Sequence, residues 1–117
     1  MPEETKTFRQ LDDEVKKIAN LYRIYQARKE LRTISHQSPV SMVLHEPSYP
    51  ISLHEEKHYM AMVELALKRL LEDERRIIRN DYFFDQTNNW WCTYYSRSLY
   101  YRIKKQALNQ FIAFLSL

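Results

Sequence analysis

The last part of the chain carries side chains that can bind a polyanion such as nucleic acid. From Tyr100 to Phe114, apolar residues recur at steps of three and four, which predicts a helix over about residues 97–114 with one apolar face. Winding this helix at 100° per residue places a polar set on the opposite arc and two cations on its flanks. The arc holds Ser98, Tyr101, Arg102, Lys105 and Asn109, and the flanks hold Arg97 and Lys104. Because no Asp or Glu follows Asp85, this face has cations without carboxylates beside them in the sequence, which suits a helix that enters the DNA major groove.

The start of the predicted helix suits a phosphate group. Ser96 can act as the N-cap, because its hydroxyl can accept a hydrogen bond from a backbone N–H of the first turn. The positive end of the helix dipole then lies next to Arg97 and Ser98, where it favours an anion. We therefore expect Arg97 and Ser98 to contact the DNA backbone. Tyr101 and Arg102 would face base edges, and Lys104 and Lys105 would neutralise further phosphates.

Two more helices are predicted directly before this one. Asn88 or Asn89 can cap a short helix, and a tight turn around residues 95–97 then leads into the last helix. The short helix carries Trp90, Trp91, Tyr94 and Tyr95. Upstream, apolar residues between Leu70 and Tyr82 fit an amphipathic helix whose other face is rich in arginine. Three short helices of this kind have the size of a DNA-binding unit, and they predict a helix-turn-helix at about residues 88–114.

The same stretch resembles a known family. Between Leu71 and Leu108 it reads L-x(2)-E-R-x-I-I-x(3)-Y-F, then W-W, then Y-S-x-S-x-Y-Y-R-x-K-K-x-A-L. This pattern is similar to the C-terminal half of the ArpU-type phage transcriptional regulators, a group that is in turn similar to region four of sigma factors. The resemblance implies a helical fold, double-stranded DNA as the partner and a role in regulating transcription.

A second function class fits the same residues. The net charge of +3 is modest, and the C-terminal half is rich in aromatic residues. Both features are also expected of a protein interaction module, for example one that binds RNA polymerase, which keeps the helix-turn-helix only as a scaffold. The sequence leaves this alternative open.

Composition favours one all-α domain over residues 1–117. A chain of 117 residues with 44% hydrophobic and 28% charged residues has the make-up of a single globular domain. The absence of glycine excludes glycine-rich phosphate loops and dinucleotide-binding fingerprints, and a helical architecture tolerates that absence best. The single cysteine excludes an intramolecular disulfide. We find no signal peptide and no apolar run that could span a bilayer, so we expect a cytoplasmic protein.

The N-terminal part predicts a long amphipathic helix over about residues 1–33. Thr7 and Gln10 have the spacing of a capping box, and an apolar stripe follows to about Arg32. The stripe consists of Phe8, Leu11, Val15, Ile18, Tyr22 and Tyr25, widened by Leu21, Ile24 and Leu31. It is wide enough for a helix that packs into the core of its own chain, and three heptads also permit a homodimer through this helix.

Residues 34–51 predict a connection, and residues 52–117 predict the remaining helices. Three X-Pro pairs interrupt the connection, although residues 40–44 could form a short strand. Ser52 and Glu55 form a second capping box, which opens a helix to about Leu71. The expected fold is therefore a small all-α multi-helix bundle with a long N-terminal amphipathic helix and a C-terminal helix-turn-helix.

The most specific sign of an enzyme is the run His54-Glu55-Glu56-Lys57-His58, which matches the H-E-x-x-H pattern of zinc proteases. It lies in the first turn of its helix, its inner positions are charged, and a third ligand would have to come from His36, His45 or Glu64. We interpret it as a solvated helix start in a protein that is not an enzyme and needs no cofactor or metal.

Two further expectations concern the aromatic segment. Cys92 adjoins the two tryptophans and has no pattern of cations around it, so we expect a buried structural thiol. Because neighbouring positions on a short helix cannot both face inward, we expect one of Trp90 and Trp91 to be buried and the other partly exposed.

Overall fold

The computed structural model describes residues 6–35, 53–84 and 86–116, and these form helices and turns without any strand. The α-helices are α1 (Phe8–Ser35), α2 (Leu53–Arg69), α3 (Glu72–Ile78) and α4 (Arg97–Leu115). A π-helical turn over Arg79–Phe83 extends α3, and a 3₁₀ turn over Trp90–Thr93 precedes α4. The prediction of a small all-α multi-helix bundle is confirmed. Most of the predicted 34–51 connection, the strand considered at 40–44 and the Ser52 end of the second capping box lie outside the described residues.

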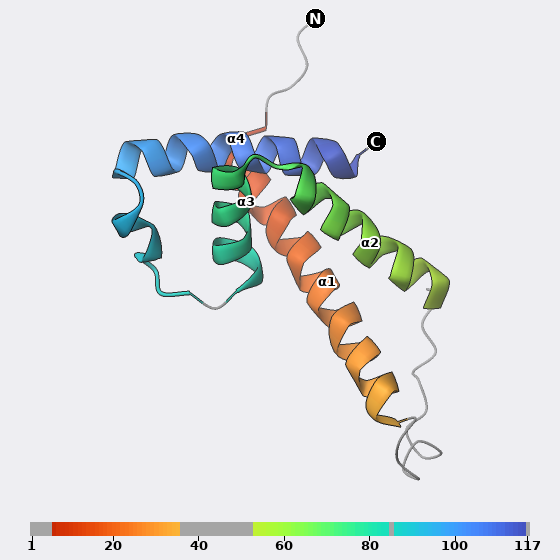
Figure 1. The fold of residues 1–117 in the computed structure, drawn as a ribbon. Coiled ribbons are helices and arrows are strands. Elements are labelled where there is room, and N and C mark those ends of the chain that lie inside the picture. Colours follow the sequence, from red (N-terminus) through yellow and green to blue (C-terminus); the bar gives the residue numbers. More distant parts are fainter. Residues whose placement is uncertain (1–5, 36–52, 85, 117) are drawn as a thin grey trace, which may run out of the picture.

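The helices pack around one main core at the crossing of α4 with the other elements. Figure 1 shows α4 lying across the start of α1 and the end of α2, while α1 and α2 run away from it side by side. α3 lies between α4 and the connection that leads to the 3₁₀ turn. The core contains side chains from every α-helical layer: Leu11, Val15, Ala19, Val63, Ala66, Leu70, Ile78, Tyr82, Ala107, Leu108 and Phe111.

α1 begins at the predicted capping box and serves as a core helix of its own chain. The Thr7 backbone N–H donates to Gln10 Oε1 at 2.8 Å, and the Gln10 N–H donates to Thr7 Oγ1 at 3.2 Å. Leu11 and Val15 are fully buried in the core. Two residues that widen the stripe towards its end lie outside the core: Ile24 is 52% exposed and Leu31 is 55% exposed. Most of the stripe is therefore occupied within the chain, and the homodimer stays a prediction.

A buried carboxylate joins the start of α2 to the C-terminal half of α1. Glu56 is 1% exposed, and its oxygens lie 2.9 Å from Arg28 Nη2 and 3.4 Å from Arg32 Nη2. The expectation of a solvated helix start is therefore wrong at Glu56, which turns inward because two arginines of α1 face it. His54 and His58 are exposed, and the described part of the chain holds no group of three or more metal-binding side chains.

α2 and α3 are separate helices although neither Gly nor Pro stands between them. Leu71 is extended, with φ −63° and ψ 159°, and its N–H donates to Glu74 Oε1 at 3.1 Å. The Arg75 N–H donates to the Leu71 carbonyl at 2.8 Å. The buried Glu74 caps the start of α3, and this cap separates α3 from α2 where a glycine or proline would do so in other proteins.

The predicted helix pair at 88–114 takes a shorter form than expected. Its first member is only the 3₁₀ turn over Trp90–Thr93, and three residues separate this turn from α4. α4 itself begins where predicted, because the Leu99 N–H donates to the Ser96 hydroxyl at 3.3 Å. The helix that packs most extensively on α4 is the short α3, and residues 86–96 form an aromatic connection that leads to α4.

Candidate nucleic-acid interface

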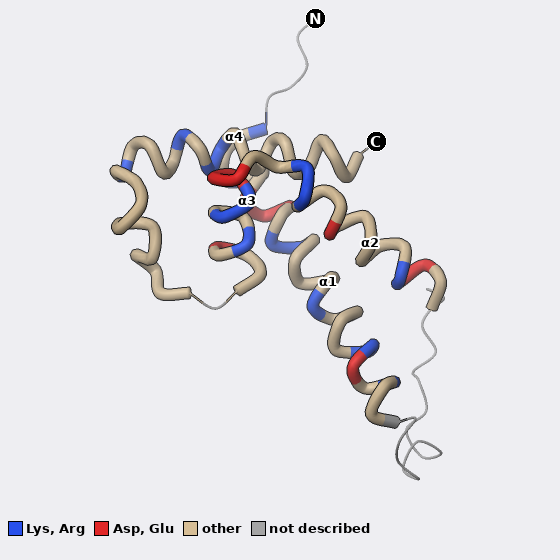
Figure 2. Tube along the Cα trace, viewed as in Figure 1, with Lys and Arg blue, Asp and Glu red and all other residues tan. Residues whose placement is uncertain are grey.

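Five of the six predicted contact residues lie on an exposed side of α4. Arg97, Ser98, Tyr101, Arg102 and Lys105 are exposed, and we call this set the open face of α4. Figure 2 shows the cations of α4 gathered in its N-terminal half, with no acidic residue on that helix. Across residues 6–35, 53–84 and 86–116, no carboxylate pairs with Arg97, Arg102 or Lys105. The open face therefore presents unpaired positive charge to solvent.

Lys104, the sixth predicted contact residue, points into the protein. Its Nζ lies 3.0 Å from Asp81 Oδ2, and its side chain is only 13% exposed. The same ammonium donates to the Tyr100 hydroxyl at 3.3 Å and lies 5.2 Å from the centre of the Tyr82 ring. Its charge is already compensated, so Lys104 lies apart from the open face and belongs to the packing of α4.

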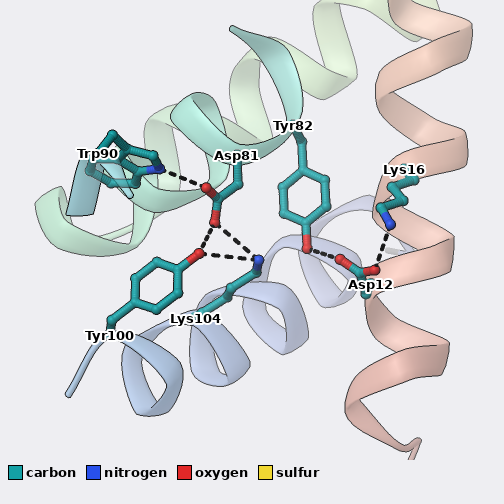
Figure 3. A network of polar contacts seen from close by, with 7 residues as sticks. All are labelled: Asp12, Lys16, Asp81, Tyr82, Trp90, Tyr100 and Lys104. Carbon is teal, nitrogen blue, oxygen red and sulfur yellow. Dashed lines mark hydrogen bonds and ion pairs between the residues drawn. The ribbon is translucent and has the colours of Figure 1, made fainter. Parts of the chain in front are cut away.

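Asp81 joins three elements through one carboxylate. Trp90 Nε1 donates to its Oδ1 at 2.7 Å, and the Tyr100 hydroxyl and Lys104 Nζ both donate to its Oδ2. Figure 3 shows these four residues, which we call the Asp81 cluster, converging from the π-helical turn, the 3₁₀ turn and α4. Burial of the Tyr100 phenol raises its pKa far above the usual value of 10.0, and the bond to the Asp81 carboxylate raises this pKa further. The cluster ties the N-terminal half of α4 to the π-helical turn and the 3₁₀ turn, while the residues of the open face stay outside it.

A second carboxylate links the same turn to α1. The Tyr82 hydroxyl donates to Asp12 Oδ1, and Lys16 Nζ lies 2.9 Å from Asp12 Oδ2 (Figure 3). Burial by itself would raise the pKa of Asp12. The hydrogen bonds from Tyr82 and Lys16, together with the charges of Lys16 and Lys104, nevertheless hold the pKa of Asp12 below its ordinary value of 3.8. α1 therefore supports the turn that carries Asp81.

Aromatic rings cover the flank of α4 between the Asp81 cluster and the open face. Trp91 stacks on Tyr100 with ring centres 4.5 Å apart and an angle of 10° between the planes. Tyr101 meets the edge of Trp91 at 6.4 Å and the edge of Phe8, from α1, at 6.1 Å. Trp90 and Trp91 are both half-buried, so the expectation of one buried tryptophan was wrong. Each ring instead packs on Tyr100 of α4, Trp90 edge-on and Trp91 stacked.

Cys92 is exposed, which corrects the expectation of a buried thiol. The neighbouring tryptophans suggested burial. Their rings pack on α4, however, and Cys92 points to solvent from the same 3₁₀ turn.

An open cleft of about 670 Å³ borders the Asp81 cluster between α1 and α4. Its lining is mixed in charge, with Asp12 and Asp81 beside Lys16, Arg23 and Lys104. Every buried side-chain nitrogen and oxygen among the described residues has a hydrogen-bond partner. In addition, none of the described helices has the length and apolar character needed to cross a bilayer.

Sequence reasoning missed Asp81 altogether. Its partners Trp90, Tyr100 and Lys104 lie nine, nineteen and twenty-three positions further along the chain, and no local pattern connects them. The available signal was weak: Asp81 and Asp85 are the last carboxylates before the cationic segment, which makes them candidates to pair with a cation of α4 that becomes buried.

Comparison with known proteins finds no matching family model, curated protein or solved structure. The resemblance to ArpU-type regulators therefore depends on the residues of this sequence alone. A function has to be argued from the geometry of α4 and of the elements that hold it.

Proposed function

We propose that this chain is a small DNA-binding regulator of transcription that places the N-terminal half of α4 in the major groove of double-stranded DNA. The observation that supports this most is the division of cations on α4. Lys104 is paired with Asp81 at 3.0 Å, while the described residues supply no carboxylate to Arg97, Arg102 or Lys105. A helix that exposes unpaired cations on one side, close to its positive dipole end, has the electrostatic character of a phosphate-binding surface.

The open face divides into contacts of different kinds. Arg97 and Ser98 stand in the first turn of α4 and contact the DNA backbone, where the backbone N–H groups of a helix start also favour phosphate. Tyr101 and Arg102 lie one turn further along and face base edges. Lys105 follows on the same side and neutralises a phosphate. Lys104 has no direct contact with DNA in this proposal.

The resemblance to ArpU-type regulators supports the same function, because many of its matching residues fall on α4 and on the turn before it. Tyr100 and Lys104 of that pattern belong to the Asp81 cluster, and Ser98, Tyr101 and Arg102 belong to the open face. The pattern thus includes residues that hold α4 as well as residues that α4 exposes. The proposal includes no enzymatic step.

The test is the affinity for random-sequence duplex DNA as a function of salt, measured by fluorescence anisotropy. Two exposed cations on phosphates, Arg97 and Lys105, predict a slope of about −2 in a plot of log K against log salt concentration. The double variant Arg102→Ala/Lys105→Glu should lose most of the affinity and reduce this slope by about one, since Lys105 is the member of the pair that contacts a phosphate. Its matched control is Lys29→Ala/Lys57→Glu, which changes the charge equally at the ends of α1 and α2 remote from the N-terminal half of α4. Equal loss in both double variants would contradict a role of the open face.

An interaction module is the second candidate, with RNA polymerase as one protein partner. It is favoured by aromatic side chains that the fold leaves outside: Tyr94 is 59% exposed and Phe84 is 47% exposed. Such side chains are enriched in protein interfaces. This candidate predicts little affinity for duplex DNA even at low salt, so the same titration separates the two functions.

A further inference from the structure

Tyr101 is the one large, mostly apolar side chain on the open face of α4. Its neighbours there are a serine, two arginines and a lysine, and it lies three residues after Ser98 and four before Lys105. Residues at these spacings share one side of a helix, so Tyr101 stands in the middle of the open face. It is 44% exposed. The open face is thus cationic at both ends and apolar at its centre.

Aromatic contacts on several sides fix the position of the Tyr101 ring. Phe8 of α1 and Trp91 of the 3₁₀ turn meet it edge-on at 6.1 and 6.4 Å, and Tyr100 lies 4.9 Å away. In the described part of the chain, its hydroxyl has no hydrogen-bond partner. The ring is therefore braced by elements that are distant in sequence, and its remaining edge faces solvent.

The major groove offers one kind of apolar group. Base edges there present hydrogen-bond donors and acceptors, except for the C5-methyl group of thymine. The Tyr101 ring, held in place by its aromatic neighbours at the centre of a cationic helix face, offers an apolar surface on which that methyl group can pack. A wedge between base pairs would instead require the whole ring to project from the protein, whereas more than half of Tyr101 is covered.

We infer that Tyr101 is a specificity-determining residue that packs on a thymine methyl group, so that the protein prefers sites with thymine at the position facing the centre of α4. This inference rests on the proposed function, because it requires α4 to lie in the major groove. Phe8 acts as a positioning residue in it, since it contacts the ring of Tyr101 and not the base. The cations of the open face supply affinity, and Tyr101 supplies a choice among base pairs.

The experiment replaces thymine by uracil, which pairs identically and lacks only the methyl group. Preferred sites are first selected from randomised duplexes with the parent protein, and each thymine of the selected site is then replaced in turn. One position should show a loss of about fourfold in affinity, the effect of one buried methyl group. Tyr101→Phe keeps the ring and should keep this ratio, whereas Tyr101→Ala should bring the ratio to one.

Lys105→Ala is the control for a general loss of affinity. It should weaken binding to the thymine and uracil duplexes equally and leave their ratio at about four, because a phosphate contact carries no sequence information. Thermal unfolding of each variant verifies that the bundle is intact. Should Tyr101→Ala fail to fold, Tyr101→Phe and the uracil scan of the parent protein still decide the matter.

The outcomes separate this inference from the proposed function. Selected sites with a steep salt slope, but without any position sensitive to uracil, overturn the role of Tyr101 and leave DNA binding in place. A uracil-sensitive position that persists in Tyr101→Ala, or that is lost in Tyr101→Phe, overturns it as well, since another group or the hydroxyl then reads the base. If no duplex binds above the level of the Arg102→Ala/Lys105→Glu variant, both the inference and the proposed function fail.

Discussion

The two sides of α4 differ in how they place identical lysine side chains: one side covers and pairs the charge, and the other exposes it. Lys104 and Lys105 are neighbours in sequence, yet Lys104 is 13% exposed with its ammonium 3.0 Å from Asp81, and Lys105 is exposed with no ion pair among the described residues. The inner side of α4 is held by the Asp81 cluster and by stacked rings. The outer side has no such restraint on its charges.

This difference shows how a mildly basic protein can present a strongly cationic surface. The net charge is only +3, because 15 Asp and Glu offset most of the charge of the 18 Lys and Arg. α4 itself has no carboxylate, and among the described residues its one ion pair is the one that Lys104 makes with Asp81 on the inner side. The charges left on the open face are those that this carboxylate does not reach. Local position relative to Asp81, and not the total charge, makes the surface suitable for DNA.

The largest effect should come from removing the carboxylate that holds the inner side. Asp81→Ala leaves Trp90 and Tyr100 without their acceptor and Lys104 as a mostly covered, unpaired charge. We expect a loss of about 2–4 kcal/mol in the free energy of unfolding. Urea unfolding followed by tryptophan fluorescence measures it directly, because both tryptophans lie in the connection that Asp81 anchors. Asp13→Ala, at an exposed position of α1, should stay within about 0.5 kcal/mol of the parent. Similar losses for both variants would show that the Asp81 cluster does not determine stability.

A smaller effect should follow from acid, through the second carboxylate on the inner side. The pKa of Asp12 is lower in the folded protein than its ordinary value of 3.8, so the folded state releases this proton more readily than the unfolded state. Its contribution to stability is therefore present above the unfolded pKa, and it disappears as the pH falls through 3.8 towards the folded pKa. Between about pH 5 and pH 3, Asp12→Asn should lose less stability than the parent protein, as measured by urea midpoints. Parallel acid curves for the two proteins would exclude Asp12 as one of the groups responsible.

The sequence was informative wherever structure follows from neighbouring residues. The repeat of apolar positions predicted α1 and α4, and the Thr7 and Ser96 caps were found at their helix starts. It also predicted which residues of α4 would be exposed, with Lys104 as the exception. These features depend on helical periodicity and on hydrogen bonds that span three or four residues.

The remaining features depend on contacts between distant parts of the chain. Glu56 is buried because Arg28 and Arg32 face it from α1, and Lys104 turns inward because a π-helical turn places Asp81 beside it. The aromatic connection contains a 3₁₀ turn in place of a regular helix, and its tryptophan rings pack on Tyr100 and Tyr101 of α4. None of these pairings has a signature in a single sequence.

The most direct test of the division between the two sides of α4 compares Lys104→Met with Lys105→Met. Methionine keeps an unbranched apolar stem and removes the charge in both cases. We predict that Lys105→Met reduces the salt slope of duplex binding by about 0.9, the effect of one lost phosphate contact, while Lys104→Met leaves the slope unchanged and lowers the unfolding free energy instead. A slope that falls equally in both variants, or only in Lys104→Met, would contradict the assignment of an open cationic face and a paired inner face.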